Sequence, residues 1–303
     1  FRKKKLKPKI AIYSNEGWSI GRIHDSIIEY LSNDYDFKFF NWHNNNDNLE
    51  FNSTWNDYDA ILSNGTISKL NDKTDPNFYK KAICVSWAEP NLEGGYFIEL
   101  IGDNPDILWG APTLDIQKSL KDLFNINAMS VIAGVNKKDF FPTRKINKIT
   151  TLGLSGRPGT HDGWDYIKRP GMMKNIALNA NIKYEFIHSK SSNEHHNLYK
   201  DIDMYICTSR SEAGPYGIAE AAFCKIPVIS TPVGYALKFK SIKTFTTVDE
   251  AVSIINDLNS HPKKLEKYIN DVYEELTRNL NWKHVAKTYW KPLIEKRLNS
   301  NKT

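Results

Sequence analysis

Short apolar runs recur along this chain, and segments between them carry apolar residues at helical spacing. The runs that predict strands lie at 10–13, 37–40, 60–63, 82–86, 149–154, 183–188, 204–208 and 228–230. A short apolar run bounded by turn residues is typical of a buried strand. After the first run, Ile23, Ile27, Ile28 and Leu31 fall on one helical face. Strands that alternate with helices predict an α/β fold built from βαβ units.

The segment 204–230 carries the most informative pattern. It predicts a strand, a turn, a helix and a second strand, which together make one βαβ unit. The turn reads Gly-Pro-Tyr-Gly at 214–217, and glycine and proline favour a tight turn there. Glu212 stands before the helix, and Glu220 lies about one turn inside it. A carboxylate is therefore expected on each side of the turn.

These two carboxylates indicate the kind of ligand that the turn could hold. A helix N-terminus presents unpaired N–H groups and the positive end of the helix dipole, so it binds phosphate. Glycine allows close approach of the backbone to an anion because it has no Cβ. A carboxylate repels phosphate and suits sugar hydroxyls, so Glu212 and Glu220 together point to a nucleotide-sugar. Taken singly, Glu212 could be an acid near the N-cap and Glu220 a solvated helix residue.

The pair Glu212 and Glu220 has the spacing E-x7-E, and 221–229 continues as Ala-Ala-Phe-Cys-Lys-Ile-Pro-Val-Ile. The stretch resembles the retaining GT-B enzymes of glycosyltransferase family 4. The resemblance implies an α/β protein with two Rossmann-like domains that face each other across a cleft, and a C-terminal helix that crosses back to the first domain. It also implies transfer of a sugar from a nucleoside-diphosphate sugar, UDP favoured over GDP, to an acceptor hydroxyl with retention of anomeric configuration.

The resemblance also implies where the domains divide. The segment 130–142 is similar to the one that ends the first domain in the family. An acceptor domain is expected at 1–141, completed by a C-terminal helix at 282–303, and a nucleotide-sugar domain at 142–281. Pro292 is expected to kink or break the last helix, because proline lacks the N–H that helix bonding needs.

The resemblance assigns the donor to the second domain. In the family, an arginine after the first strand of this domain and a later lysine bind the donor diphosphate. Arg157 matches the arginine, and Lys168 is chosen as the lysine, with Arg169 as its competitor. Such cations stabilise the charge that grows on a leaving group, and Glu212 completes the catalytic set. The donor-binding residues are Gly156, Arg157, Lys168, His188, Glu212, Gly214, Pro215, Tyr216, Gly217 and Glu220.

Two residues of the first domain are assigned to the acceptor side. Gly17 lies in the turn after the first strand, a turn that faces the cleft in the family. Glu89 follows the strand at 82–86, and α/β folds place ligands at the carboxyl ends of strands. Non-functional roles also remain open for three residues: an acid in a loop for Glu89, a histidine in a loop for His188 and a surface charge for Lys168.

Other polar residues are interpreted as structural. The three D-x-D sequences at 34–36, 57–59 and 201–203 each precede a predicted strand. No metal ion and no cofactor are expected, because cations and a helix N-terminus can balance the charge of the donor. The asparagines at 44–46 predict a polar loop, and His24 is expected on a helix surface.

Composition and charge predict the cellular compartment and the possible binding partners of the protein. The 303 residues allow two domains, and 40% hydrophobic with 25% charged residues is ordinary for a globular protein. The odd number of cysteines, Cys84, Cys207 and Cys224, predicts reduced thiols. With no signal peptide or membrane-spanning run recognised, a cytoplasmic location is expected. The net charge of +6 and the basic run at 2–9 leave open a peripheral contact with a membrane surface or nucleic acid, with a solvated tail as the alternative.

Two rival functions remain. A non-catalytic two-lobed protein that binds a sugar or nucleotide would need the cleft but leaves Arg157 and the two glutamates unexplained. A glycosyltransferase that acts on nucleic acid would fit the net charge, but no motif for binding RNA or DNA is present.

Overall fold

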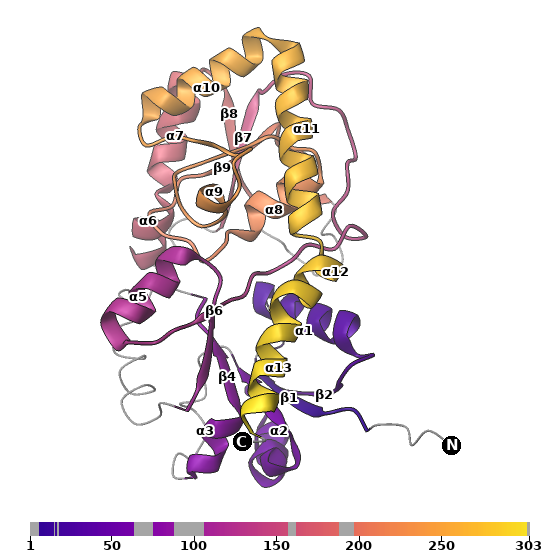
Figure 1. Ribbon diagram of the computed structural model, residues 1–303. Helices are drawn as coiled ribbons and strands as arrows, with labels where there is room; N and C mark the ends of the chain where they lie inside the picture. The colour runs from indigo at the N-terminus through magenta and orange to yellow at the C-terminus, as the bar shows by residue number, and fades with distance from the viewer. Residues whose placement is uncertain are drawn as a thin grey trace. The chain divides into compact units, whose positions relative to one another are not determined.

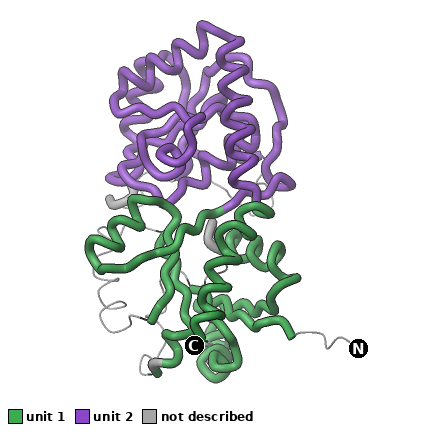
Figure 2. Tube along the Cα trace, in the orientation of Figure 1, with its two compact units in different colours: residues 1–133, 282–303 green, residues 134–281 purple. Residues whose placement is uncertain are grey.

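The computed structural model describes residues 6–14, 16, 18–63, 75–87, 106–156, 162–187 and 197–301. The chain folds into two compact units, drawn in different colours in Figure 2. Unit 1 comprises Phe1–Ala133 together with Trp282–Thr303, and unit 2 comprises Gly134–Asn281.

Within its described residues, unit 1 contains one parallel sheet of six strands in the order β2-β1-β3-β4-β5-β6 (Figure 1). The strands are β1 (Lys9–Ser14), β2 (Asp36–Asn41), β3 (Ala60–Ser63), β4 (Ala82–Val85), β5 (Leu108–Ala111) and β6 (Met129–Ser130). The helices are α1 (Trp18–Leu31), α2 (Asn45–Thr54), α3 (Pro76–Lys81), α5 (Leu114–Phe124), α12 (Trp282–Val285) and α13 (Lys291–Ser300). Every residue of β3 and β4 is buried, as their uninterrupted apolar runs predict.

The C-terminal segment belongs to unit 1, which confirms the predicted return of the last helix. The Trp290 indole Nε1 donates to the Ile132 carbonyl oxygen at 2.9 Å. The buried Arg297 guanidinium donates to the carbonyl oxygens of Lys80 at 2.7 Å and Asp106 at 2.6 Å. Helical bonding changes to a π-helical turn at Ala286–Trp290, between α12 and α13 and just before the proline at 292, which has no N–H to donate.

Within its described residues, unit 2 contains a parallel sheet of five strands in the order β11-β10-β9-β7-β8. The strands are β7 (Thr151–Ser155), β8 (Lys183–Ile187), β9 (Met204–Cys207), β10 (Val228–Ser230) and β11 (Lys243–Thr244). The helices are α6 (Asp162–Lys168), α7 (Pro170–Asn179), α8 (Tyr216–Phe223), α9 (Tyr235–Lys238), α10 (Val248–Ser260) and α11 (Pro262–Asn279).

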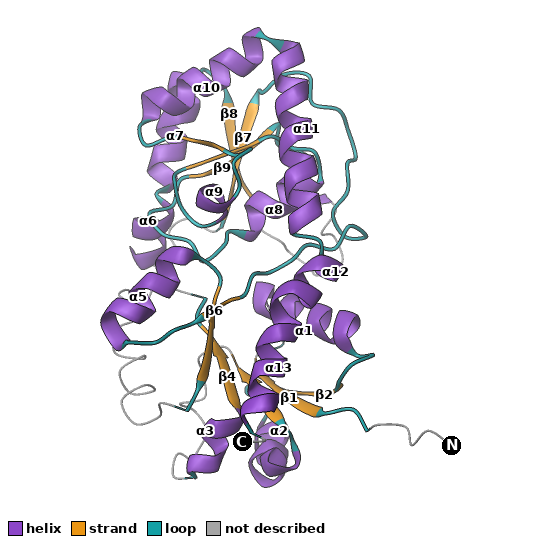
Figure 3. Ribbon diagram, viewed as in Figure 1, coloured by secondary structure: helices purple, strands orange, loops and turns teal. Residues whose placement is uncertain are grey.

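Helices cover both faces of the sheet of unit 2. Figure 3 shows β7, β8 and β9 between α7 and α10 on one side and α8 and α11 on the other. The residues of α8 from Gly217 to Phe223 are all buried, because the helix lies between the sheet and α11. A parallel sheet with helices on both faces, built from βαβ units, makes each unit Rossmann-like.

Two local expectations from the sequence are wrong. The asparagines at 44–46 begin helix α2: the side chain of Asn44 caps it by accepting from the Asn46 backbone N–H at 2.9 Å, and Phe51 anchors it in the core. His24 is only 1% exposed, because its face of α1 packs inward, and its ring centroid lies 6.2 Å from that of Phe39.

Candidate functional site

The strand order of unit 2 identifies a place at the carboxyl ends of its strands where a ligand can bind. From β7 the chain moves to β8 on one side and then to β9 on the other, so the connections diverge between β7 and β9. In open α/β sheets, ligands bind beyond the carboxyl ends of the strands at such a switch point. Here β7 ends at Ser155 and is followed by Gly156, and β9 ends at Cys207 and is followed by Thr208.

An ion pair lies beyond this switch point. The Lys168 ammonium, at the end of α6, contacts Oε1 of Glu212 in the loop after β9. The Ser209 hydroxyl donates to the same oxygen at 2.6 Å, and the Cys207 thiol lies 3.6 Å from the Ser209 oxygen. The side chains of Lys168 and Glu212 are 25% and 12% exposed. The pair is thus shielded from water on most sides.

Burial and charge act on Lys168 in opposite directions. Burial is the largest influence and lowers the pKa of its ammonium, but Glu212 and then Cys207 together raise it by more, so the pKa of Lys168 ends above its ordinary value. Lys168 therefore remains a cation at neutral pH.

The backbone around Lys168 is tied to the loop after β9. The Thr208 hydroxyl donates to the Lys168 carbonyl oxygen at 2.6 Å. The Arg169 guanidinium donates to the carbonyl oxygens of Thr208 at 2.6 Å and Ser209 at 3.2 Å. Arg169 also has a φ of +50°, which non-glycine residues seldom adopt. Between the two cations proposed from the sequence, Lys168 is the one beside Glu212, and Arg169 braces the backbone.

Two glycines allow the loop that carries Glu212 to pack closely against the start of α9. Gly214 has a φ of +110°, and a Cβ there would lie 2.9 Å from the Tyr235 ring. Gly234 has a φ of +52°, and a Cβ there would lie 2.8 Å from Cδ of Pro215. Larger residues at either glycine would strain the backbone and push the loop outward.

The predicted turn at 214–217 is shorter than expected. Pro215 is the N-cap of α8, so Tyr216 and Gly217 are already helical. Gly217 packs directly over Tyr205 of β9, since a Cβ at Gly217 would lie 2.2 Å from the Tyr205 hydroxyl oxygen. The N-terminus of α8 is thereby held against the sheet, four residues after Glu212.

Glu220 lies inside unit 2, so its interpretation as a solvated helix residue is wrong. It is 4% exposed, and its Oε2 accepts a hydrogen bond from the Tyr199 hydroxyl at 2.6 Å. Burial, and then the charge of Glu220, raise the pKa of Tyr199 well above its ordinary value. The same two causes raise the pKa of Cys224 to about 12, so both neighbours stay protonated.

The D-x-D acid at 203 has a structural role. Asp203 accepts from the Arg144 guanidinium at 2.9 Å, and from the backbone N–H groups of Thr150 at 2.9 Å and Thr151 at 3.1 Å. The Thr150 hydroxyl also donates to Asp203. Burial raises the pKa of Asp203, but the Thr150 hydroxyl, the Arg144 guanidinium and the Thr150 N–H together lower it by more, so the pKa ends below its ordinary value. Among the residues that the structure describes, no group of three or more histidine, cysteine or acidic side chains could hold a metal ion.

Several predicted residues fall outside the described part of the chain: Arg157, His188, Gly17 and Glu89. Gly156 is described and directly follows β7, with a φ of +137°. The basic run at 2–9 is described only from residue 6 onward, where the Lys7 ammonium donates to the Ser32 carbonyl oxygen at 2.7 Å.

The structure adds polar partners that sequence reasoning missed. Ser209 and Tyr199 each donate to one of the two glutamates. Ser209 stands three residues before Glu212, a spacing that could have suggested the contact. Tyr199 is 21 residues from Glu220, and no local signal connects them.

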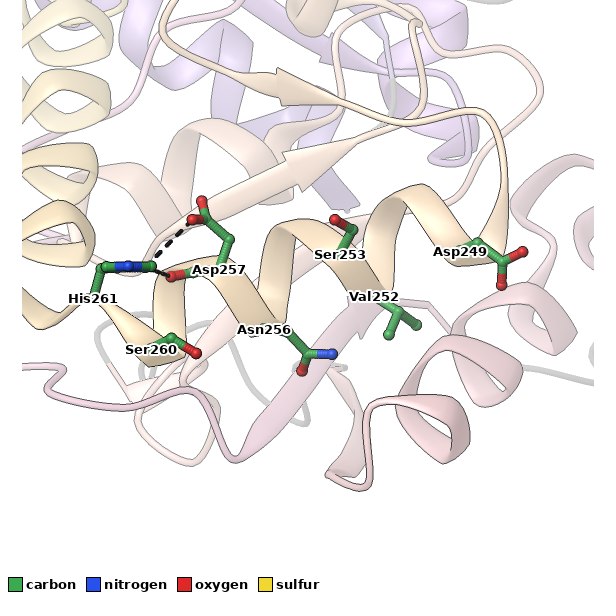
Figure 4. A pocket seen from close by; sticks show the side chains of 7 residues that line it. All are labelled: Asp249, Val252, Ser253, Asn256, Asp257, Ser260 and His261. Carbon is green, nitrogen blue, oxygen red and sulfur yellow. Dashed lines mark hydrogen bonds and ion pairs between the residues drawn. The ribbon is translucent and has the colours of Figure 1, made fainter.

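A surface hollow elsewhere on unit 2 contains none of the candidate residues. It runs along the exposed side of α10, and seven residues line it (Figure 4): Asp249, Val252, Ser253, Asn256, Asp257, Ser260 and His261. Within it, His261 Nδ1 lies 2.8 Å from the Asp257 carbonyl oxygen. This contact closes the C-terminal turn of α10 and provides no separate chemistry.

A comparison with protein-family models identifies the chain. Residues 118–275 match the model described as glycosyl transferases group 1. The chain belongs to this family. The matched segment holds every donor-site residue proposed from the sequence, and membership confirms the resemblance to GT-B glycosyltransferases.

Solved structures show the same fold. Anabaena HepE, in complex with UDP and glucose, superposes with a TM-score of 0.73 at 12% identity, covering 95% of this chain and 100% of that chain. Sucrose-phosphate synthase from Thermosynechococcus elongatus superposes with a TM-score of 0.71 at 12% identity, covering 97% and 100%. The N-terminal domain of Candida albicans trehalose-6-phosphate phosphatase has a TM-score of 0.67 at 11% identity, covering 98% of both chains. At such identities the likeness shows the GT-B fold alone.

A comparison with curated proteins finds no match. None of the helices in the described residues combines the length and the apolar character needed to span a bilayer.

Proposed function

We propose that this glycosyltransferase moves a sugar from a UDP-sugar to an acceptor hydroxyl with retention of anomeric configuration. The observation that carries the proposal is the juxtaposition of Lys168 and Glu212 beyond the switch point between β7 and β9. A donor needs a cation for its diphosphate and a carboxylate for its sugar hydroxyls, and here the two lie side by side. UDP is favoured because the structurally similar HepE is described in complex with UDP and glucose.

Each candidate residue has a distinct role in the proposal. Lys168 and Arg157 bind the diphosphate, together with the N-terminus of α8, which attracts anions. Glu212 holds hydroxyls of the transferred sugar, and Glu220, oriented by Tyr199, holds those of the ribose. His188 lies on the base side, and Gly17 and Glu89 lie on the acceptor side.

The proposed reaction is a front-face substitution. The bond from the anomeric carbon to the diphosphate oxygen breaks, the acceptor oxygen bonds to the same face of that carbon, and the departing phosphate takes the acceptor proton. Negative charge therefore grows on the diphosphate, where Lys168 and Arg157 stabilise it without help from a divalent ion.

Three buried free cysteines, Cys84, Cys207 and Cys224, support a reducing compartment such as the cytoplasm.

A donor screen tests this function. UDP-, GDP- and ADP-sugars are offered with a panel of glycan and other hydroxyl acceptors, nucleotide release is measured, and the anomeric configuration of the product is read by NMR. Arg157→Ala should lower turnover at saturating donor by roughly a hundred- to a thousandfold, the usual effect of losing one preorganised charge. Lys263→Ala, on the exposed start of α11, is the control and should leave turnover unchanged. An inverted product would refute retention, and nucleotide binding without any transfer would favour the non-catalytic rival.

A further inference from the structure

The two groups proposed to bind adjacent parts of the donor, its diphosphate and its sugar, form an ion pair with each other in the ligand-free chain. The Lys168 ammonium contacts Glu212 Oε1, which also accepts from Ser209. Both side chains are mostly shielded from water. A ligand that takes Lys168 must therefore remove the cation from a carboxylate that water reaches poorly.

We propose that the Lys168–Glu212 pair makes the site select the complete nucleotide-sugar over the spent nucleotide. This inference rests on the proposed function. A sugar-nucleotide replaces both halves of the pair, because its diphosphate takes Lys168 and its sugar hydroxyls donate to Glu212. A bare nucleoside diphosphate replaces only one half and leaves Glu212 without its cation, beside a phosphate of the same sign.

The surroundings of Glu212 make the difference in affinity between the nucleotide-sugar and the bare nucleotide large. A shielded charge that loses its partner is destabilised far more than an exposed one. Ser209 keeps one hydrogen bond on Oε1, so the carboxylate stays in place and cannot turn away to find water easily. The neighbouring cation Arg169 is held on the backbone, where its guanidinium donates to the carbonyl oxygens of Thr208 and Ser209.

The ion pair therefore affects both donor binding and nucleotide release. When the donor binds, Lys168 exchanges Glu212 for the diphosphate and Glu212 exchanges Lys168 for sugar hydroxyls, so both charges keep a partner. After transfer the sugar is gone, Glu212 regains Lys168, and this recovery helps to expel the nucleotide. The ion pair thereby opposes product inhibition.

Glu212→Gln tests the inference because it keeps the shape and the Ser209 contact but removes the charge. Calorimetry with UDP, UDP-glucose and UDP-N-acetylglucosamine is done on the full chain and on the variant. UDP should bind Glu212→Gln about ten- to a hundredfold more tightly than the original chain, the factor expected for one hydrogen bond to a charged group. The preference for a UDP-sugar over UDP should disappear. Glu274→Gln, an exposed acid on α11 of the same unit, is the control and should change neither affinity.

Glu212→Asp provides a second reading if the glutamine variant folds poorly. It keeps the charge but withdraws the carboxylate by one methylene group, so its UDP affinity should fall between those of the original chain and the glutamine variant. Unchanged or weaker UDP binding in both variants, while the original chain binds UDP and transfers sugar, overturns this inference alone. Failure of the original chain to bind any nucleoside diphosphate overturns the proposed function, and the inference with it.

Discussion

Gly217 and Gly171 offer a matched pair of substitutions with opposite expected signs. Each is the second residue of a helix in unit 2, Gly217 of α8 and Gly171 of α7. A Cβ at Gly217 would lie 2.2 Å from the Tyr205 hydroxyl oxygen and 2.4 Å from Cζ of its ring, whereas a Cβ at Gly171 would meet nothing within 4 Å. Tyr205 is 2% exposed, so its ring has no free space to enter.

The magnitudes follow from these contacts. Forcing extra volume into a packed core destabilises by about 1–3 kcal/mol, and a tyrosine with its hydroxyl oxygen at 2.2 Å and its ring at 2.4 Å belongs at the upper end. The higher helix propensity of alanine offsets at most about 1 kcal/mol of this, since alanine loses less conformational entropy than glycine on folding. Gly217→Ala should therefore destabilise unit 2 by about 2 kcal/mol. Gly171→Ala should stabilise it by about 0.5–1 kcal/mol, because only the entropy effect remains.

Scanning calorimetry of the full chain measures both effects. For a unit of roughly 150 residues, 1 kcal/mol moves Tm by about 2–4 °C. Gly217→Ala should thus lower the Tm of unit 2 by about 4–8 °C, and Gly171→Ala should raise the same transition by about 1–4 °C. The shift in Gly171→Ala also identifies which transition belongs to unit 2. A Gly217→Ala variant as stable as the original chain would show that Tyr205 yields freely, contrary to the packing argument.

Three further outcomes are expected. Arg169→Ala should lower kcat/KM by about ten- to a hundredfold through misplacement of Lys168, and Arg169→Lys should not restore it because lysine lacks the planar fork; steady-state kinetics checks this. Tyr199→Phe removes the donor to Glu220 and should weaken UDP binding by about 1 kcal/mol in calorimetry, while equal affinities would contradict the orienting role. The pKa of Asp203 is lowered in the folded state, so its stabilisation is present above about pH 4 and is lost as the pH falls below that value. Asp203→Asn should therefore be less stable than the original chain at pH 7 and approach it near pH 3 in urea unfolding; a constant difference would contradict the linkage.

Much of the fold could be predicted because several of its strands, such as β3 and β4, are buried on both faces. The runs at 60–63 and 82–85 consist almost entirely of apolar residues, and the structure buries every residue in them. Helix α2 escaped prediction because its sequence has no apolar stripe, and asparagine favours turns in isolation. It forms through one cap at Asn44 and one anchor at Phe51, which only the tertiary structure supplies. The two-residue strand β11 is too short to produce any pattern.

The candidate site was predicted unevenly for a similar reason. Glu212 and Glu220 stand out because a short helix fixes their relation along the sequence. The contact between Lys168 and Glu212 joins residues 44 positions apart, and no spacing rule reaches that far. Nor does the sequence show that Lys168 contacts Glu212 while Arg169 donates to backbone carbonyl oxygens. Adjacent cations with equal charge differ here in the backbone conformation that directs them.

The return of the C-terminal segment to unit 1 reverses the usual order of folding during synthesis. A ribosome normally releases an N-terminal domain that can fold before the next one is made. Unit 1 lacks α12, the π-helical turn and α13 until all of unit 2 has emerged. Until then the Ile132 carbonyl oxygen has no Trp290 indole, and a gap remains where Arg297 will bind the backbone. Unit 2 can thus complete its folding first. The nascent unit 1 stays incomplete until then, with exposed core residues that chaperones could bind.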